Sequence, residues 1–289
     1  DVYGWTDKSA KPLAIRLLIN GERHKPGPEI APGFLSAVTT LDKALAPPPP
    51  NSKTTHRRLQ FAKWITNARN PLTARVLVNR LWQHHFGQAL VRTPNNFGYK
   101  SDPPTHPMLL DWLAAEFMEP TTGGGAPWTL KRLHKLIMMS DTYQQQSVHP
   151  QEVEYAQRDF LNRNLWKFNR HRLNSEALRD AMLAVSGQLN LKMGGSSFYP
   201  KMSSEALEGL SRKAGDWKNS PPDERSRRSI YMMTKRSRLL PLMTAFDFSD
   251  TTVTCGRRDV TTVAPQALAL LNNHFAHSQS EALANRLAK

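Results

Sequence analysis

The sequence predicts a mainly α fold, an irregular multi-helix bundle with a minor strand element and long ordered loops. Three observations support this prediction. Apolar residues recur at helical spacing in most segments after residue 51. Several of these segments open with a capping residue or proline and close with glycine. The 21 prolines outnumber the 15 glycines, which predicts long irregular connections between the helices.

The first 50 residues are predicted to be extended. Pro12–Asn20 mixes β-branched and other apolar residues and suits a short strand. A proline run over residues 46–52 favours a stiff spacer. We therefore expect an extended N-terminal segment with a proline-rich linker over residues 1–50 and a helical domain over residues 51–289. The chain starts without methionine and ends inside a helical pattern, so we expect a piece of a longer protein, truncated at its C-terminus.

The clearest helix is predicted over residues 70–87, NPLTARVLVNRLWQHHFG. Asn70 suits the N-cap, Pro71 the first helical position, and Gly87 the end. Two stripes at helical spacing carry large side chains, which predicts burial on two sides. One stripe holds Ala74, Leu77, Val78, Leu81 and His85, and the other holds Arg75, Asn79, Trp82 and Phe86.

The remaining helices and a second strand are predicted from less regular patterns of apolar residues. Further helices are predicted over residues 56–67, 106–119, 129–146, 173–187 and 265–289. A second strand is predicted over Arg227–Arg236, which is rich in β-branched and aromatic residues. Residues 190–224 read as an irregular insertion or a lid.

The formal net charge is +15, from 39 basic and 24 acidic residues. Two interpretations remain open. The excess could form a surface for anions such as nucleic acid, acidic polysaccharide or anionic lipid. Alternatively, arginines could bind internal carboxylates and carbonyls. The basic pairs are scattered rather than regularly interleaved with aromatic residues, which disfavours nucleic acid.

Several classes of chemistry are disfavoured by composition. The one cysteine, Cys255, excludes an internal disulfide and a covalent haem motif, and we expect a small buried residue rather than a nucleophile. No window approaches the roughly 20 apolar residues of a membrane helix. Serine-hydrolase and cysteine-protease signatures are missing from the sequence.

An ordered series of motifs carries a family resemblance. NPLTARVLVNRLWQHHFG is followed by LVRTPNNFG, HPMLLDWLA, LHKLIMMSDTYQQ, RLNSEALRDAMLAVSGQL, RRSIYMMTKR, FDFSD and TTVAPQALALLN. Together they resemble a planctomycete-specific domain family of unknown function, Domain of Unknown Function 1553. The sequence departs from the family pattern at Asn20, Ala89 and Asn96, where arginine, glycine and aspartate are usual.

The resemblance implies a biological setting. The family occurs in large exported bacterial proteins beside cytochrome-c-like modules, which implies a periplasmic or cell-envelope location. It also implies a cytochrome-c-like module of the same polypeptide as a partner, with any haem in that neighbouring module and no cofactor in this chain. The family supplies no catalytic residues to carry over.

Charged residues inside the motifs are the candidate site residues. The anion-binding candidates are Arg80, Arg228, Lys235, Arg236 and Arg258. His106, Asp111 and Asp247 are the candidates for acid and base catalysis. The competing interpretation is that both aspartates pair with arginines to fix loops onto the helical body.

Histidines provide only weak metal candidates. His274 and His277 have the i, i+3 spacing of helical ligands, but no third ligand is close in sequence. His84 and His85 are adjacent, so they cannot both face one ion, and we expect His85 to be a hydrogen-bonded core residue. No metal site is therefore predicted.

These observations favour an accessory or ligand-binding module of an exported, cytochrome-c-associated bacterial protein, with acidic polysaccharide as the expected ligand. One alternative is a hydrolase or redox enzyme acting on carbohydrate. Another is a docking domain for an electron-transfer partner, where a basic face would meet an acidic cytochrome surface.

Overall fold

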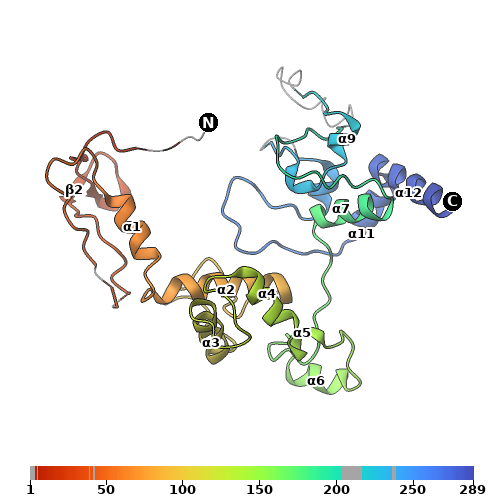
Figure 1. Ribbon diagram of the computed structural model, residues 1–289, viewed down its shortest axis with the longest axis horizontal. Helices are drawn as coiled ribbons and strands as arrows, with labels where there is room; N and C mark the ends of the chain where they lie inside the picture. Colours follow the sequence, from red (N-terminus) through yellow and green to blue (C-terminus); the bar gives the residue numbers. More distant parts are fainter. Residues whose placement is uncertain (1–3, 5, 39, 42, 203–216, 236–238) are drawn as a thin grey trace. The chain divides into compact units, whose positions relative to one another are not determined.

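The computed structural model describes residues 4, 6–38, 40–41, 43–202, 217–235 and 239–289. The chain, shown in Figure 1, divides into two compact units, unit 1 (Asp1–Asn169) and unit 2 (Arg170–Lys289). This division does not coincide with the boundary predicted near residue 51. Residues 1–50 are grouped with the helices of unit 1.

The mainly helical prediction is confirmed. In the part of the chain that the structure describes there are eleven α-helices and one two-stranded sheet. Long connections join many of these helices, in agreement with the richness in proline. No helix among the described residues combines the length and the apolar character needed to cross a membrane.

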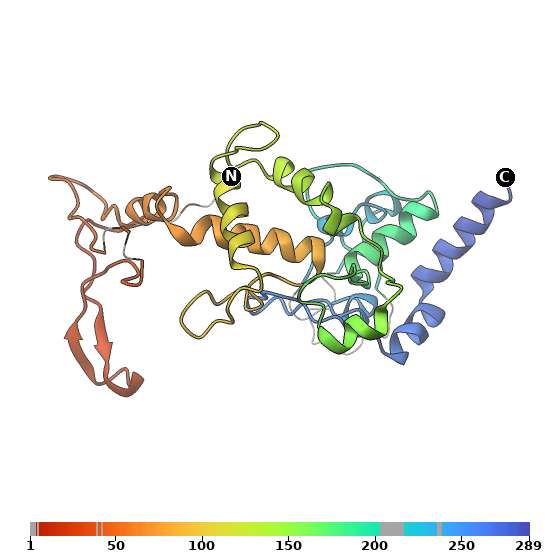
Figure 2. The ribbon, with the colours of Figure 1, turned by 90° about the horizontal axis from the view of Figure 1, so that it is seen from below.

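The minor strand element is an N-terminal hairpin. Strand β1 (Arg16–Leu18) pairs antiparallel with β2 (Pro26–Glu29), as Figure 2 shows. β1 occupies the second half of the predicted strand at Pro12–Asn20. Both strands are largely exposed to solvent.

The core of unit 1 is formed by α2 (Pro71–Phe86), α3 (Pro107–Met118) and α4 (Leu130–Met138). The α2 helix has the predicted ends: Asn70 Oδ1 accepts a hydrogen bond from Leu72 N, and Gly87 has a φ of 75°. The two predicted faces are both covered. Buried α2 residues are Ala74, Val78, Asn79, Trp82 and Phe86, and the four apolar ones pack with Leu110, Leu113, Phe117, Leu133 and Ile137 of α3 and α4.

A buried amide fixes the chain that follows α2. Asn79 is fully buried, and its Nδ2 donates to the carbonyl oxygen of Val91 at 3.0 Å. The Val91 N–H donates back to Asn79 Oδ1 at 2.8 Å. Because both polar groups of the amide are paired, the side chain can lie in the core. The pair holds Leu90 and Val91 against the helices.

Three shorter helices complete unit 1, namely α1 (Arg57–Ile65), α5 (Asp141–Gln144) and α6 (Glu152–Arg158). The single helix predicted over residues 129–146 is wrong, because the chain breaks between α4 and α5. At the break Ser140 Oγ accepts from Tyr143 N and caps α5. A serine hydroxyl competes well for backbone N–H groups, so it favours a new helix start.

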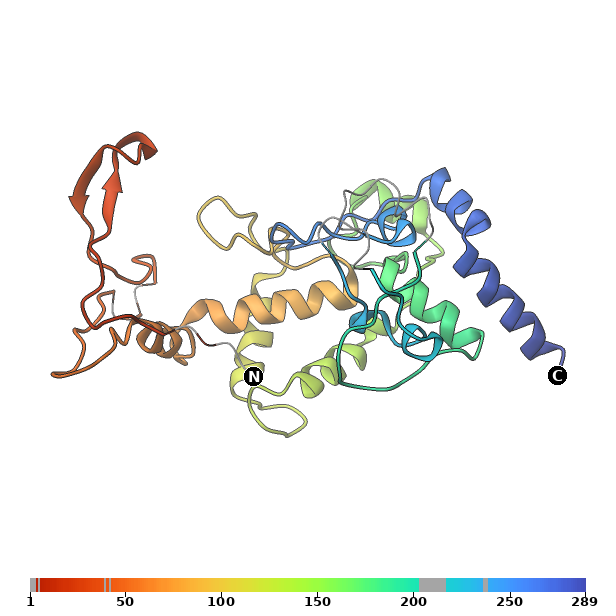
Figure 3. The ribbon, with the colours of Figure 1, turned by 90° about the horizontal axis from the view of Figure 1, so that it is seen from above.

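Unit 2 contains α7 (Ser175–Val185), α9 (Pro222–Arg225), α10 (Pro241–Ala245), α11 (Ala264–Asn272) and α12 (His274–Leu287). Helix α7 contacts α10 and α12. The one long helix predicted over residues 265–289 is wrong, and Figure 3 shows two separate helices. Asn273 separates them, since its Oδ1 accepts from Phe275 N and Ala276 N at the start of α12.

The strand predicted over Arg227–Arg236 is also wrong. A 3₁₀ helix spans Ser229–Tyr231, and Asp180 Oδ1 accepts from both the N–H and the hydroxyl of Ser229. The Asp180 carboxylate thus accepts the backbone N–H of Ser229, which in a β-strand would donate to a neighbouring strand. Among the described residues nearby there are only isolated bridges, at Asn190↔Arg227 and Phe198↔Met232, and Arg236 of the predicted strand lies outside the described residues.

Candidate ligand-binding pocket

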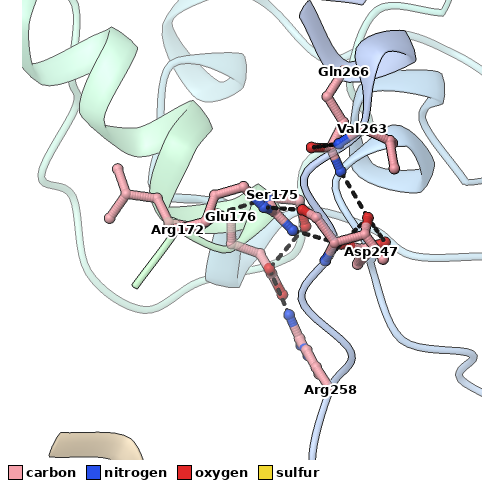
Figure 4. A network of polar contacts seen from close by, with 9 residues as sticks. Arg172, Ser175, Glu176, Asp247, Arg258, Val263 and Gln266 are labelled. Carbon is pink, nitrogen blue, oxygen red and sulfur yellow. Dashed lines mark hydrogen bonds and ion pairs between the residues drawn. The ribbon is translucent and has the colours of Figure 1, made fainter. Parts of the chain in front are cut away.

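The motifs of unit 2 meet in a network of polar contacts (Figure 4). Arg172 Nη2 lies 2.6 Å from Asp247 Oδ2, and Arg172 Nε donates to the Thr261 carbonyl oxygen at 2.9 Å. The N–H of Thr261 donates to Asp247 Oδ2 at 2.8 Å. This bond, with the nearby guanidinium of Arg172, lowers the pKa of Asp247. These contacts connect three segments that are far apart in the sequence, around Arg172, Asp247 and Thr261.

A second ion pair belongs to the same network. Arg258 Nη1 lies 2.7 Å from Glu176 Oε2, which also accepts from the hydroxyl of Ser175 (Figure 4). The hydrogen bond to Glu176 raises the pKa of Arg258. Arg258 therefore attaches its loop to the start of α7 instead of presenting a free charge.

The other candidate acid and base residues lie in unit 1. Asp111 Oδ1 accepts from Arg75 Nε at 2.6 Å, and this bond lowers the pKa of Asp111. His106 precedes α3, and its Nδ1 lies 3.0 Å from Thr105 Oγ1. Both candidate aspartates are thus ion-paired with arginines, as the competing interpretation expected.

The remaining anion-binding candidates are dispersed. Arg80 donates to Asn95 Oδ1 at 3.1 Å, and Arg228 is exposed before the 3₁₀ helix. The Lys235 ammonium lies over the rings of Tyr199 and Trp217, 5.6 and 5.5 Å from their centroids. Arg236 lies outside the described residues.

No metal centre is assembled by the residues that the structure describes. His277 Nε2 lies 2.6 Å from the carbonyl oxygen of Leu271, and His274 is exposed. Cys255 is exposed, so the expectation of a buried cysteine is wrong.

His85 is hydrogen-bonded, as expected for a histidine on the α2 apolar stripe. Its Nε2 lies 2.8 Å from Nδ1 of His134 on α4, and its ring meets Tyr143 edge-on. The residue is half-buried rather than fully enclosed. Burial lowers the pKa of His85, with a smaller contribution from His134.

A pocket of about 870 Å³ lies among the described residues of unit 2. This volume lies within the range of roughly 300–1,000 Å³ that is typical of small-molecule sites. Its walls come from α7, α10, the first turns of α12 and the segments around residues 200 and 225. The apolar lining includes Leu183, Met202, Leu242 and Phe275.

Among the described residues, the charged lining of this pocket is basic. Arg179, Lys201 and Arg225 line it, and no aspartate or glutamate stands among the described lining residues. His274 and several amide or hydroxyl side chains add hydrogen-bonding groups. This composition favours a ligand with negative charge.

Arg179 anchors one wall. It is only 4% exposed, and its guanidinium donates to the carbonyl oxygens of Arg225 and Arg227 and to Ser229 Oγ. Its carbon Cζ lies 5.3 Å from the ring centroids of both Phe198 and Phe275. Burial lowers the pKa of Arg179 to about 10, so the side chain stays protonated at neutral pH.

The other two cations of the pocket have no ion-pair partner among the described residues. Lys201 is exposed, whereas Arg225 is half-buried. The Nε atom of Arg225 is buried and makes no hydrogen bond. A buried donor without an acceptor costs roughly 1–3 kcal/mol.

Sequence reasoning missed this pocket. Its cations lie outside the predicted anion-binding set, and their segments share no periodic pattern. One signal was available. Arg179 lies within the motif RLNSEALRD, and Arg225 lies two residues before the motif RRSIY. Neither motif indicates by itself that the two residues meet.

Fold and pocket together define a mainly helical protein with a basic cavity in its C-terminal unit. The chain belongs to the family described as "Protein of unknown function (DUF1553)", whose profile matches residues 57–289. The match begins close to the boundary predicted near residue 51. No curated protein matches the chain, and neither does any solved structure.

Proposed function

We propose that this chain is an accessory ligand-binding module that takes an acidic ligand into the pocket of unit 2. The observation that carries the proposal is the lining, which contains three basic residues and no carboxylate among the described lining residues. Two of them have no ion-pair partner in the described part of the chain. The net charge of +15 would also attract anions over longer distances.

The proposed ligand is the end of an acidic polysaccharide. A uronic acid offers a carboxylate for a cation and an apolar ring face for a side chain such as Phe275. The pocket volume suits a short segment rather than a whole polymer.

Binding of a defined oligouronide to the full chain tests this proposal. Tetragalacturonic acid should bind with an affinity that decreases as salt is added, because ion pairs in the pocket are partly screened. Its fully methyl-esterified form has nearly the same shape without the charge and should bind much more weakly. Equal binding of both forms, or binding of neither, would contradict the proposal.

The setting of the module is a further part of the proposal. We propose that it works in an exported protein of the bacterial periplasm or cell envelope, beside a cytochrome-c-like module. The family resemblance motivates this placement. Purification of the full-length native protein and a haem absorption spectrum would test it, and a full-length protein without haem would count against it.

A carbohydrate-acting enzyme is less well supported. The candidate residue Asp247 is ion-paired with Arg172, and Asp111 is ion-paired with Arg75. Neither residue lines the pocket. Binding without turnover of the tetrasaccharide is therefore expected, and release of shorter saccharides would favour the enzyme.

A further inference from the structure

Arg225 lines the pocket and has no ion-pair partner among the described residues, which makes it the candidate for a specific anion site. We infer that Arg225 binds the anionic group of the ligand, and that its guanidinium recognises an oxyanion rather than a neutral hydroxyl group. This inference rests on the proposed function and assigns the residue that would determine its specificity.

The backbone of Arg225 is held in place. Its N–H donates to the Pro221 carbonyl oxygen at 3.0 Å, at the end of α9. Its own carbonyl oxygen accepts from Arg179 Nη2 at 2.5 Å. Because the guanidinium of Arg179 itself contacts two aromatic rings, the backbone of Arg225 is attached to a fixed part of the pocket wall. A fixed start reduces the entropy lost when the side chain binds a ligand.

The side chain of Arg225 has no protein partner in the described part of the chain. It makes no ion pair with the described residues, and its buried Nε makes no hydrogen bond. A neighbouring arginine shows the contrast: Arg227 is fully buried, and it pairs with Glu224 and donates to the carbonyl oxygens of Ser196 and Gly194. Of these two arginines, only Arg225 lines the pocket.

Arginine chemistry determines the class of ligand group. The planar guanidinium donates two parallel hydrogen bonds to a carboxylate, sulfate or phosphate, a geometry that a neutral hydroxyl group cannot complete. Lys201, the other lining cation without an ion-pair partner among the described residues, is exposed on a flexible stem and should contribute mainly through its charge.

Three variants of the full chain test the assignment. Arg225→Gln should weaken binding of tetragalacturonic acid by roughly 10-fold to 100-fold, the loss expected for a charge-assisted hydrogen bond. It should also remove most of the preference over the methyl ester. Arg225→Lys should recover part of the affinity. Lys201→Gln, the matched control, should weaken binding by less than about fivefold. Thermal melting of each variant confirms folding.

A second measurement separates this inference from the proposed function. The Nε–H resonance of Arg225 is followed in chain labelled with ¹⁵N-arginine, and is assigned by its loss in Arg225→Lys. Inorganic phosphate and tetragalacturonic acid are added in separate titrations. We expect both to shift this resonance.

Each outcome has a defined meaning. A shift with phosphate but not with the saccharide would support the anion site and overturn the proposed saccharide ligand. Saccharide binding that is unchanged in Arg225→Gln would overturn the inference and leave the proposed function standing. No shift and no binding with either probe would overturn both.

Discussion

Arg172 and Asp247 are 75 residues apart in the sequence, yet their side chains form an ion pair with a 2.6 Å contact. Both side chains are about one-fifth exposed, so solvent screens the pair only in part. Asp247 has a φ of 57°, a left-handed backbone conformation that aspartate and asparagine tolerate better than most residues. The pair thus joins a tight turn to the segment before α7.

Replacement of Asp247 by asparagine should destabilise unit 2. Asparagine keeps the size and tolerates the same backbone conformation, but it removes the charge that binds Arg172 and Thr261. We expect the free energy of unfolding to decrease by roughly 1.5–3 kcal/mol, measured by urea denaturation at neutral pH. Asp259→Asn is the control, because Asp259 is exposed, and its effect should stay within about 0.5 kcal/mol. Equal effects of the two variants would contradict this role for Asp247.

Glu116 should make unit 1 sensitive to acid. This buried carboxylate accepts hydrogen bonds from Thr121 and Thr122 and pairs with Arg132, and the Thr121 hydroxyl is the main cause that lowers its pKa to about 2. A lowered carboxyl pKa stabilises the fold above the unfolded-state value near 4.5. That stabilisation disappears as the pH falls towards 2.

Glu116→Gln should therefore be less stable than wild type at pH 7, and the difference should narrow between pH 4.5 and pH 2. Urea denaturation at a series of pH values measures this difference in the free energy of unfolding. Glu119→Gln is the matched control at the exposed end of α3 and should follow the wild-type curve. A difference between Glu116→Gln and wild type that stays constant with pH would contradict the charged role of Glu116.

The contact between His85 and His134 should produce a second pH dependence. Burial lowers the pKa of His85 below its usual value of 6.5, so the unfolded chain binds a proton more readily than the folded one. The contribution of neutral His85 to the free energy of unfolding is therefore fully present above pH 6.5. It is lost progressively as the pH falls below 6.5. His84, His134 and Tyr143 are the titratable groups placed against this ring.

In His85→Gln this decline should be smaller, because the residue with the lowered pKa is gone. His84→Gln replaces the exposed neighbour and should keep most of the wild-type pH dependence. Thermal melting across pH 5 to 8 compares the three proteins. If the melting temperature of His85→Gln fell more steeply with decreasing pH than that of wild type, the direction assigned to the pKa shift of His85 would be contradicted.

Leu133 tests the core of unit 1. It is fully buried on α4, whereas Leu130 on the same helix is 45% exposed. Leu133→Ala should cost about 2–5 kcal/mol of unfolding free energy, since it removes buried surface and leaves a cavity. Leu130→Ala should cost much less. Similar losses in the two variants would contradict the packing described for α4.

Helices with regular patterns were predictable from the sequence. Asn70, Pro71 and Gly87 marked the ends of α2, because capping depends on local backbone chemistry that neighbouring residues determine. The breaks at Ser140 and Asn273 were not predicted. There a side chain captures N–H groups a few residues ahead, which interrupts a pattern whose apolar spacing continues.

The pocket was much less predictable than the helices. Arg179, Lys201 and Arg225 come from separate segments, and only tertiary packing brings them to one cavity. Sequence alone could not show which cations are neutralised: Arg258 is paired with Glu176, but Arg225 has no ion pair with the described residues. The general idea that many arginines bind internal partners was correct for Arg172, Arg179 and Arg227.

Calorimetric titration of the full chain with tetragalacturonic acid, beside its methyl ester, tests the central claim most directly. The account predicts binding of the acid that weakens as ionic strength rises, together with much weaker binding of the ester. Arg225→Gln should remove that discrimination while the protein stays folded. Indistinguishable heats for acid and ester in the wild-type protein would contradict the account.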